Sequence, residues 1–333
     1  MLDNFTIRTT EGVVFTCEAG QTILDAAEKC GVVLPYSCKT GRCSTCKCRV
    51  ISGLSVTRVA EVGLSTPEMQ NGWVLSCVRS PKSDMLIEVE NLSDLILPKP
   101  RTLPCRIQSL KRLSNHVIEV KLRLPPSGSN FSYLPGQYID LIGPNGIRRS
   151  YSLASAKGEY LELHVGYVEN GFMSSYWFNA AKTNDLLRLY GPLGTFFLRD
   201  FSNLDLVFLA TGTGIAPVKA MLETLKGRTM VNRPRSVSVY WGVRTEQDLY
   251  LNLSNFIGDV RYVPVLSRSD GTWAGVRGYV QQQFIRDFAD CSMVAVMAAG
   301  SSDMVSDART LCHQFGLPGS RFFADAFVSS SIT

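Results

Sequence analysis

Histidine is scarce in this chain of 333 residues, and a serine-hydrolase motif is missing. The three histidines, His116, His164 and His313, are scattered and pair with no cysteine, which argues against a Rieske iron centre. No serine stands in a G-x-S-x-G sequence, so the chain shows no equipment for hydrolysis by a serine nucleophile. His164 lies in the alternating run Y-L-E-L-H-V and is expected to be a strand residue rather than a metal ligand.

Long apolar runs and concentrated charge are missing as well. No stretch reaches about 18 apolar residues, and the N-terminus M-L-D-N-F-T-I-R lacks the basic and apolar regions of a secretion signal. We therefore expect a cytoplasmic protein that binds no membrane. The net charge of +5 is mild and the basic residues are dispersed, which indicates no nucleic-acid partner. With 45% hydrophobic and 19% charged residues, the chain is globular and long enough for about two or three domains.

Cysteine, by contrast, is abundant, and four of the ten cysteines have an informative spacing. Cys38, Cys43 and Cys46 form the run C-K-T-G-R-C-S-T-C, and Cys77 follows in W-V-L-S-C-V, which is the spacing of a plant-type 2Fe–2S ferredoxin. Small residues such as Gly41 let backbone amides approach the sulfurs. A zinc site or structural cysteines are the alternative, although zinc usually takes two short C-x-x-C pairs and only one is present. The remaining six are expected to be core or surface thiols: Cys17, Cys30, Cys48, Cys105, Cys291 and Cys312.

The first part of the chain has the pattern of a small ferredoxin domain. Residues 1–90 alternate like short strands around a helical stretch at Thr22–Cys30, and this order of a strand pair, a helix and later strands describes a β-grasp unit. Residues 91–103 contain two prolines within three residues and are expected to form an interdomain linker.

The rest of the chain changes its pattern at about residue 200. In residues 104–200, short β runs are broken by proline and glycine, as expected of an antiparallel barrel, with one helical patch near Met173–Ala181. In residues 201–333, continuous apolar strands alternate with helical segments, which predicts a parallel, Rossmann-like α/β sheet.

A group of residues in the predicted barrel has the chemistry of a flavin site. Arg149, Tyr151 and Ser152 follow a strand and an N-G turn. The guanidinium is suited to a pyrophosphate, the phenol ring to stacking on a flat heterocycle, and the serine to hydrogen bonding at its edge. Downstream, Gly171 and Ser174 open a helical segment whose free amides and hydroxyl form a phosphate seat. An ordinary barrel aromatic is the alternative role for Tyr151.

The run A-T-G-T-G-I-A-P follows the first apolar strand of the last domain and opens a helix. Gly212, Thr213 and Gly214 form a turn in which the glycines allow close backbone approach to a dinucleotide, and Pro217 suits the first helical turn. This is not the Rossmann G-x-G-x-x-G motif, because Pro217 takes the place of the third glycine.

The next strand ends in Y-W-G-V-R, which resembles the segment that holds the adenosine half of NAD(P) in ferredoxin–NADP reductases. Arg244 is positioned to pair with a phosphate, and Asp248 lies within reach of a ribose. No cluster of basic residues suited to a 2′-phosphate stands out, so NADH is favoured as the coenzyme and NADPH remains the alternative.

Together these motifs resemble the ferredoxin–NADP reductase superfamily, and the resemblance covers essentially the whole chain. The segment around R-R-S-Y-S, the upstream L-P-G-Q-Y-I-D-L and the G-T-G-x-A-P run carry it. The resemblance implies a β-grasp ferredoxin, an antiparallel six-stranded FAD-binding β-barrel and a Rossmann-like NAD domain. It also implies that Arg149, Tyr151, Ser152 and Ser174 bind FAD. Gly166 stands where close relatives often carry Arg or Lys, so one positive charge near the cofactor is missing.

Two further segments carry implied roles near the reacting atoms. V-M-A-A-G-S resembles the strand end that abuts the nicotinamide, with Ala299 in place of the family's cysteine before Gly300. We expect hydride transfer to survive but to be slower or less well oriented than in relatives with the cysteine. F-A-D-A-F resembles the family's terminal segment, in which Phe327 is expected to cover the nicotinamide-facing side of the flavin, with a hydrophobic anchor as the alternative. The predicted catalytic residues are Tyr151, Ser152, Ala299 and Phe327.

The combination of parts implies an iron–sulfur flavoprotein reductase. Electrons are expected to run from NADH to FAD, to the 2Fe–2S cluster and then to a partner enzyme. L-R-L-P-P-S, R-R-S-Y-S-L-A and the tail F-F-A-D-A-F-V look closer to CDP-6-deoxy-glucoseen reductases, which serve the pyridoxamine-dependent sugar 3-dehydratase of 3,6-dideoxyhexose biosynthesis. Reductases of Rieske aromatic-ring dioxygenases and related monooxygenases are the alternative. A redox sensor or general electron donor without a dedicated partner is the second alternative.

The cysteine loop also suggests where the acceptor docks. Lys39, Arg42, Lys47 and Arg49, here called the basic rim, lie between Cys38 and Arg49 without an acidic residue. We expect this rim to meet an acidic patch on the acceptor, which speeds encounter at low salt. Ordinary solvated surface is the alternative.

Overall fold

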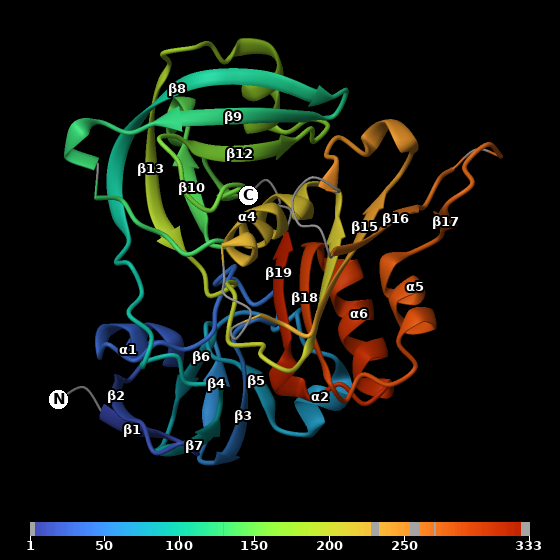
Figure 1. Ribbon diagram of the computed structural model, residues 1–333. Helices are drawn as coiled ribbons and strands as arrows, with labels where there is room; N and C mark the ends of the chain where they lie inside the picture. Colours follow the sequence, from blue (N-terminus) through green and yellow to red (C-terminus); the bar gives the residue numbers. More distant parts are fainter. Residues whose placement is uncertain (1–3, 129, 228–232, 254–259, 270, 328–333) are drawn as a thin grey trace. The chain divides into compact units, whose positions relative to one another are not determined.

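The computed structural model describes residues 4–128, 130–227, 233–253, 260–269 and 271–327 (Figure 1). Contacts divide the chain into two units, which are described separately. The first comprises residues up to Ile96 and the end of the last strand, and the second runs from Leu97 to Ala324. None of the helices in these ranges is both long and apolar enough to cross a membrane.

The first unit is built on a five-stranded sheet with one central parallel pair, β1 and β7. In sheet order its strands are β2 (Val14–Glu18), β1 (Asn4–Thr9), β7 (Met85–Glu88), β3 (Lys47–Ser52) and β5 (Trp73–Leu75). A short pair, β4 (Ser55–Thr57) and β6 (Arg79–Pro81), and helix α2 (Thr66–Gln70) complete the unit. Helix α1 (Ile23–Lys29) starts where the hydroxyl of Thr22 accepts the N–H of Asp25, and it buries Ile23 and Leu24 in the core. The predicted β-grasp fold is confirmed.

The second unit begins with a six-stranded antiparallel sheet. In sheet order its strands are β11 (Arg148–Ser152), β10 (Tyr138–Ile142), β13 (Leu186–Leu193), β8 (Arg101–Ser114), β9 (Val117–Arg123) and β12 (Leu161–Gly166). A bridge between Leu153 and Leu163 joins the two edge strands, so the sheet closes on itself as a barrel. The predicted helical patch is α3 (Phe172–Ser175), followed by one π-helical turn at Tyr176–Ala180. Strand β8 starts at Arg101, within the stretch expected to be linker.

The second unit continues with a sheet whose inner strands are parallel and mostly apolar. In sheet order they are β17 (Val276–Arg277), β16 (Val260–Leu266), β15 (Ser236–Val243), β14 (Asp205–Thr211), β18 (Val294–Ser301) and β19 (Phe322–Phe327). The helices are α4 (Ile215–Lys226), α5 (Val280–Asp287) and α6 (Ser302–Gln314). Figure 1 shows α4 between the barrel strands and the parallel sheet, and α5 beside α6. Burial on both faces explains the continuous apolar strands seen in the sequence.

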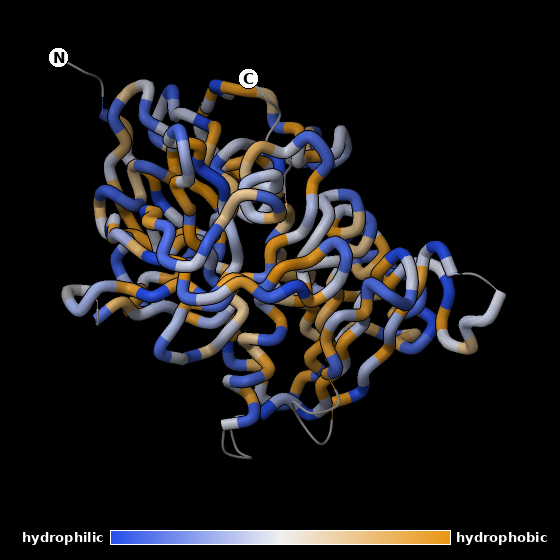
Figure 2. The backbone as a smooth tube through the Cα atoms, turned by 90° about the horizontal axis from the view of Figure 1, so that it is seen from above, coloured by the Kyte–Doolittle hydropathy of each residue, from blue (hydrophilic) through white to orange (hydrophobic). Residues whose placement is uncertain are grey.

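Alternation of residue type along the strands accounts for the packing of both units. In β12, for example, Leu161, Leu163 and Val165 are buried in the barrel core. Figure 2 shows hydrophobic and hydrophilic stretches alternating along the chain. His164 is a strand residue of β12, as expected, although it too is buried. The predicted fold classes of all three domains are confirmed, whereas the domain boundaries stay predictions.

Candidate cofactor sites

The four cysteines of the ferredoxin pattern come together on one loop and its neighbouring turn. The Sγ atoms of Cys46 and Cys77 lie 3.1 Å apart. The backbone N–H of Cys38 points at the sulfur of Cys43, and the N–H of Thr40 at the sulfur of Cys38, each at 3.4 Å. Clustered thiols that receive backbone amides are what an iron–sulfur cluster requires, so these residues fit a 2Fe–2S group.

The backbone of this loop takes an unusual path. Lys39 and Ser44 have φ values of 55° and 61°, and Gly41 has 75°, so three residues are left-handed. A Cβ atom on Gly41 would lie 2.9 Å from the carbonyl oxygen of Ala60, and the N–H of Gly63 donates to the carbonyl of Gly41 at 2.9 Å. The segment of residues 58–63, here called the flanking segment, therefore packs directly on the cysteine loop.

Cys48 is close in sequence to the cluster ligands but separate from them in the fold. It lies in β3 opposite Val74 and is fully buried in the apolar core. Burial is the main cause that raises the pKa of its thiol to about 12, which keeps it protonated. Cys48 is thus a core residue, as expected from the sequence.

The basic rim carries internal ion pairs that the sequence does not reveal. Lys39 pairs with Glu28 at 2.8 Å, Lys47 with Glu68 at 2.6 Å, and Arg49 approaches Glu88 at 3.9 Å. Lys47 also lies over the ring of Trp73. At least three of the four rim charges are therefore partly compensated within the domain. Arg42 is exposed.

The predicted flavin residues lie on β11 and at the start of α3. Tyr151 is half-buried in β11, and its hydroxyl accepts the indole N–H of Trp177 at 2.9 Å. The two rings meet edge to face, with centroids 6.1 Å apart. Burial raises the pKa of Tyr151 to about 12 although the Trp177 hydrogen bond opposes it, so the phenol stays neutral. The ring is thus held at a fixed angle, which suits stacking on a flat cofactor.

The other flavin candidates are Arg149 and Ser152 on the same strand, and Gly171 and Ser174 at the start of α3. Arg149 is half-buried and its Nη1 donates to the carbonyl of Arg148 at 2.7 Å. Ser152 ends the same strand. Ser174 is buried, and its hydroxyl oxygen accepts the N–H of Val168 at 2.7 Å, which leaves the hydroxyl hydrogen to donate. Gly171 starts α3, as predicted for the phosphate seat, and a Cβ there would lie 3.1 Å from the carbonyl of Val168.

The ends of β14 and β18 meet so closely that only glycine fits. A Cβ on Gly214 would lie 2.2 Å from the carbonyl oxygen of Ala299, and one on Gly300 would lie 2.1 Å from Oγ1 of Thr211. Gly212 has a φ of 53° in the turn Gly212–Gly214, and its carbonyl accepts the indole N–H of Trp241 at 2.9 Å. The glycines expected to approach a dinucleotide thus also join the two strand ends.

Three further candidates for the nicotinamide coenzyme have clear positions. Pro217 lies in the first turn of α4, as expected, and is buried. Arg244 is exposed after β15, and its carbonyl accepts the N–H of Arg268, which brings a second arginine to the neighbouring strand end. Oδ2 of Asp248 accepts the N–H and hydroxyl of Thr245, so this carboxylate caps its own turn.

The catalytic roles of Ala299 and Phe327, like those of Tyr151 and Ser152, stay predictions. Ala299 is fully buried in the core cluster around α4, so a larger side chain there needs space. Phe327 ends β19 and is about one-third exposed.

Strand β12 of the barrel and the nicotinamide loop approach each other within the second unit. Gly166, at the end of β12, is so close to Thr213 that an added Cβ would contact its Cγ2 at 3.4 Å. Hydride transfer needs the two reacting atoms about 3–3.5 Å apart, so a barrel and a G-T-G turn that lie close together are compatible with it. Sequence inspection also missed a charged residue at this junction, Lys219, which has barrel partners.

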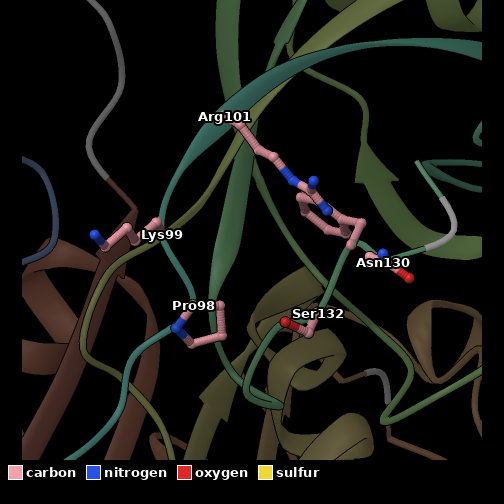
Figure 3. Close-up of a pocket in the computed structure, with 6 residues that line it drawn as sticks. Pro98, Lys99, Arg101, Asn130 and Ser132 are labelled. Atoms are coloured by element: carbon pink, nitrogen blue, oxygen red, sulfur yellow. The ribbon is translucent and has the colours of Figure 1, made fainter. Parts of the chain in front are cut away.

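A surface pocket of about 220 Å³ lies at the start of β8, away from these motifs in sequence. It is lined by Pro98, Lys99, Arg101, Asn130, Phe131 and Ser132. Figure 3 shows the Arg101 side chain extending across the pocket toward Asn130, while Lys99 points away from it. None of the predicted cofactor residues lines this pocket, so it adds nothing to the sites above.

The chain matches three known domain families in succession. Residues 6–82 match the 2Fe-2S iron-sulfur cluster binding domain, residues 104–198 the oxidoreductase FAD-binding domain, and residues 208–310 the oxidoreductase NAD-binding domain. The protein is therefore an oxidoreductase with domains for all three cofactors. The first match favours an iron–sulfur cluster over zinc at the four cysteines.

Similar proteins cover nearly the full chain. The CDP-6-deoxy-L-threo-D-glycero-4-hexulose-3-dehydrase reductase of Yersinia pestis is 41% identical over 325 residues, which are 96% of this chain and 97% of the relative. The xylene/toluene monooxygenase electron transfer component XylA of Pseudomonas putida is 32% identical over 330 residues, covering 95% and 91%. The crystal structure of the Amycolatopsis cytochrome P450 reductase GcoB superposes with a TM-score of 0.73 at 28% identity, covering 97% and 98%.

Proposed function

Because this chain belongs to the family of reductases that join a 2Fe–2S ferredoxin domain to FAD- and NAD-binding domains, we propose that it supplies electrons to a sugar dehydrase. The proposed acceptor is a pyridoxamine-dependent CDP-6-deoxy-hexulose 3-dehydrase of 3,6-dideoxyhexose biosynthesis. The observation that carries this proposal is the difference between 41% identity to the hexulose-dehydrase reductase and 32% to the monooxygenase component, at similar coverage.

The cofactors, when bound, supply the change from two-electron hydride chemistry to single-electron transfer. The protein's part is binding and orientation. Tyr151 and Ser152 would hold the flavin ring, with Arg149, Gly171 and Ser174 at its phosphates. The strand-end turn would hold the dinucleotide through Gly212, Thr213, Gly214, Pro217 and Gly300. The four thiolates of the cysteine loop would hold the irons. Support comes from the amides aimed at the sulfurs and from the fixed angle of the Tyr151 ring.

NADH is the proposed electron donor. Arg244 would contact the coenzyme. The neighbouring Arg268 is a second cation at this site, and its guanidinium is suited to the 2′-phosphate of NADPH. Initial rates of flavin reduction with equal concentrations of the two coenzymes decide between them. Faster reduction by NADH supports the proposal, and faster reduction by NADPH assigns Arg244 and Arg268 to the 2′-phosphate.

The acceptor is proposed to dock beside the cysteine loop, at Arg42 of the basic rim and at the flanking segment. In the flanking segment, the carboxylate of Glu61 accepts hydrogen bonds from Arg79 and from the N–H of Leu75. Val59 and Val62 of the same segment are 53% and 71% exposed. A partner surface with acidic and apolar groups would match this combination.

Two alternatives differ in the acceptor alone. The first is an oxygenase component, as in the name of the Pseudomonas putida relative, and the second is the absence of a dedicated partner. None of the ten cysteines, all within the described residues, forms a disulfide, which is consistent with the proposed reducing, cytoplasmic location. The test is NADH oxidation coupled to purified acceptors. Turnover with the dehydrase and its CDP-sugar, and little with an oxygenase component, is expected. The reverse order would replace the proposal by the first alternative, and no turnover with either would favour the second.

A further inference from the structure

A buried lysine links the helix behind the dinucleotide turn to the barrel. Lys219 lies on α4, and its side chain is only 10% exposed. Its Nζ donates to the carbonyl of Ala154 at 3.0 Å and lies 3.1 Å from Oε1 of Glu162, both in the barrel. On its own helix it pairs with Glu223 at 2.7 Å. A buried ammonium is expensive unless all its hydrogens have partners, and Lys219 has three oxygens around it.

Glu223 also binds the barrel segment that contains Ala154, but it accepts a hydrogen bond where Lys219 donates one. Its Oε2 accepts the N–H of Ala156 at 2.8 Å. One turn of α4 thus presents a donor to the carbonyl of Ala154 and an acceptor to the N–H of Ala156. This segment begins two residues after Ser152 in the predicted flavin strand, so α4 and the flavin strand are tied by two charge-assisted hydrogen bonds.

A second arm of the same network leads to the dinucleotide turn. Glu162 Oε1 lies 2.9 Å from Nε2 of His164, whose Nδ1 lies 3.2 Å from the hydroxyl of Tyr250. The Tyr250 ring packs edge to face on Trp241, with centroids 5.1 Å apart, and Trp241 donates to the carbonyl of Gly212. The network therefore runs without a break from strand β12 to the turn at Gly212.

The carboxylate of Glu162 and the ammonium of Lys219 both favour their charged forms. Burial by itself would raise the pKa of Glu162, but the His164 hydrogen bond and the Lys219 charge outweigh it and lower the pKa to about 2. Burial would lower the pKa of Lys219, but Glu223 and Glu162 together raise it above its ordinary value. Glu119, Glu162 and His164 also place ligand atoms within 4.8 Å of one another, but the Lys219 ammonium already lies on the Glu162 oxygen of this group.

We propose that Lys219 is a positioning residue for hydride transfer. It holds α4, and with it the turn at Gly212–Gly214, in one register against the flavin strand, so that the nicotinamide meets the flavin ring in a reactive orientation. The inference rests on the proposed binding of FAD and NADH at these two segments. Small displacements of reacting groups can slow a reaction by about a hundredfold, so a residue remote from the chemistry can control its rate.

The test compares the FAD-loaded protein with the variants Lys219→Met and Lys219→Arg, and with Lys226→Met as the matched control. Lys226 ends the same helix and is exposed. Anaerobic stopped-flow mixing with NADH gives the rate constant of flavin reduction and the dissociation constant of NADH separately. We expect Lys219→Met to reduce the rate constant about tenfold or more, with the dissociation constant within about twofold. Lys219→Arg should recover part of the rate, and Lys226→Met should leave it unchanged.

A structural measurement accompanies the kinetics. Hydrogen exchange of the peptide that contains Ala154 and Ala156 should become faster in Lys219→Met and remain unchanged in Lys226→Met. If the single variant fails to fold, the double variant Glu162→Leu/Lys219→Met replaces the buried ions by apolar side chains of similar size, a change that proteins often tolerate. The double variant should show the same loss of rate.

The possible outcomes separate this inference from the proposed function. A wild-type protein that binds no FAD, or whose FAD is not reduced by NADH, contradicts the proposed function. A wild-type protein that reacts with NADH, together with a Lys219→Met or double variant that reacts as fast, overturns the positioning role. Loss of FAD or of thermal stability with an unchanged rate in the loaded fraction also overturns it, because a purely structural role predicts that pattern.

Discussion

Gly214 and Ala299 are in such close contact that a Cβ on the glycine would lie 2.2 Å from the carbonyl oxygen of the alanine. The obstacle is backbone, so no side-chain rotation relieves it. The contact joins the turn after β14 to the end of β18, where the coenzyme is expected to bind. A glycine that is expected to admit a dinucleotide is therefore also required by the protein's own packing.

Gly214→Ala should destabilise the NAD domain and prevent its reaction with NADH. Overpacking of this kind typically costs about 1–3 kcal/mol, and backbone contact places it at the upper end. Gly212→Ala is the control, because Gly212 has open space around its Cβ position and only its φ of 53° opposes a side chain, at roughly 1 kcal/mol. Thermal unfolding and NADH-dependent flavin reduction should rank wild type, Gly212→Ala and Gly214→Ala in that order. Equal behaviour of the two variants would contradict the packing argument.

Tyr151→Phe and Tyr151→Ala separate the roles of the hydroxyl and the ring. The phenylalanine variant leaves the Trp177 N–H without its partner, which should destabilise the protein by about 1–3 kcal/mol while FAD still binds. The alanine variant removes the stacking surface and should lower the FAD content strongly. The ratio of flavin to protein absorbance measures both. Normal FAD content in Tyr151→Ala would show that Tyr151 is an ordinary barrel aromatic.

Ala299→Cys restores the residue that relatives carry before Gly300. We expect faster reduction of the flavin by NADH, because the position is expected to orient the nicotinamide. The side chain is fully buried, so the sulfur also tests whether the core around α4 accepts extra volume. Stopped-flow reduction, with thermal unfolding as the control for packing, is the measurement. An unchanged reduction rate in a stable variant would remove Ala299 from the predicted catalytic residues.

Arg42→Glu should slow electron transfer to the dehydrase severalfold at low ionic strength, and the difference should fade as salt is added. Arg8→Glu is the matched control, because Arg8 is exposed on β1 and its replacement by Glu changes the net charge by the same amount. The rate of reoxidation of the reduced protein by its acceptor measures the effect. If Arg42→Glu behaves like Arg8→Glu at low salt, the docking site lies elsewhere.

Features that depend on residues close together in the sequence could be predicted. The cysteine loop, the strand–turn–helix at Gly212–Pro217 and the capped helix at Thr22 each contain their own geometry, and the apolar strands reveal the parallel sheet. The predicted fold was confirmed for that reason.

Features that depend on partners far away in the chain could not be predicted. Glu28, Glu68 and Glu88 compensate the basic rim from separate elements, so its apparent charge exceeds its effective charge. Lys219 lies in a helix of ordinary appearance. Its partners are Glu162 in β12 and Ala154 just after β11, both more than about 50 residues earlier in the chain. An i,i+4 pair with Glu223 was the one local signal of its role.

Anaerobic titration of the purified protein with NADH, followed by addition of the dehydrase and its CDP-sugar substrate, tests the central claim most directly. Optical spectra follow the flavin, and electron paramagnetic resonance follows the cluster. The account predicts that NADH bleaches the flavin bands, that the signal of a reduced 2Fe–2S cluster appears, and that the dehydrase with its substrate removes this signal. Absence of flavin bands, or a cluster signal that the dehydrase leaves unchanged and an oxygenase component removes, would contradict it.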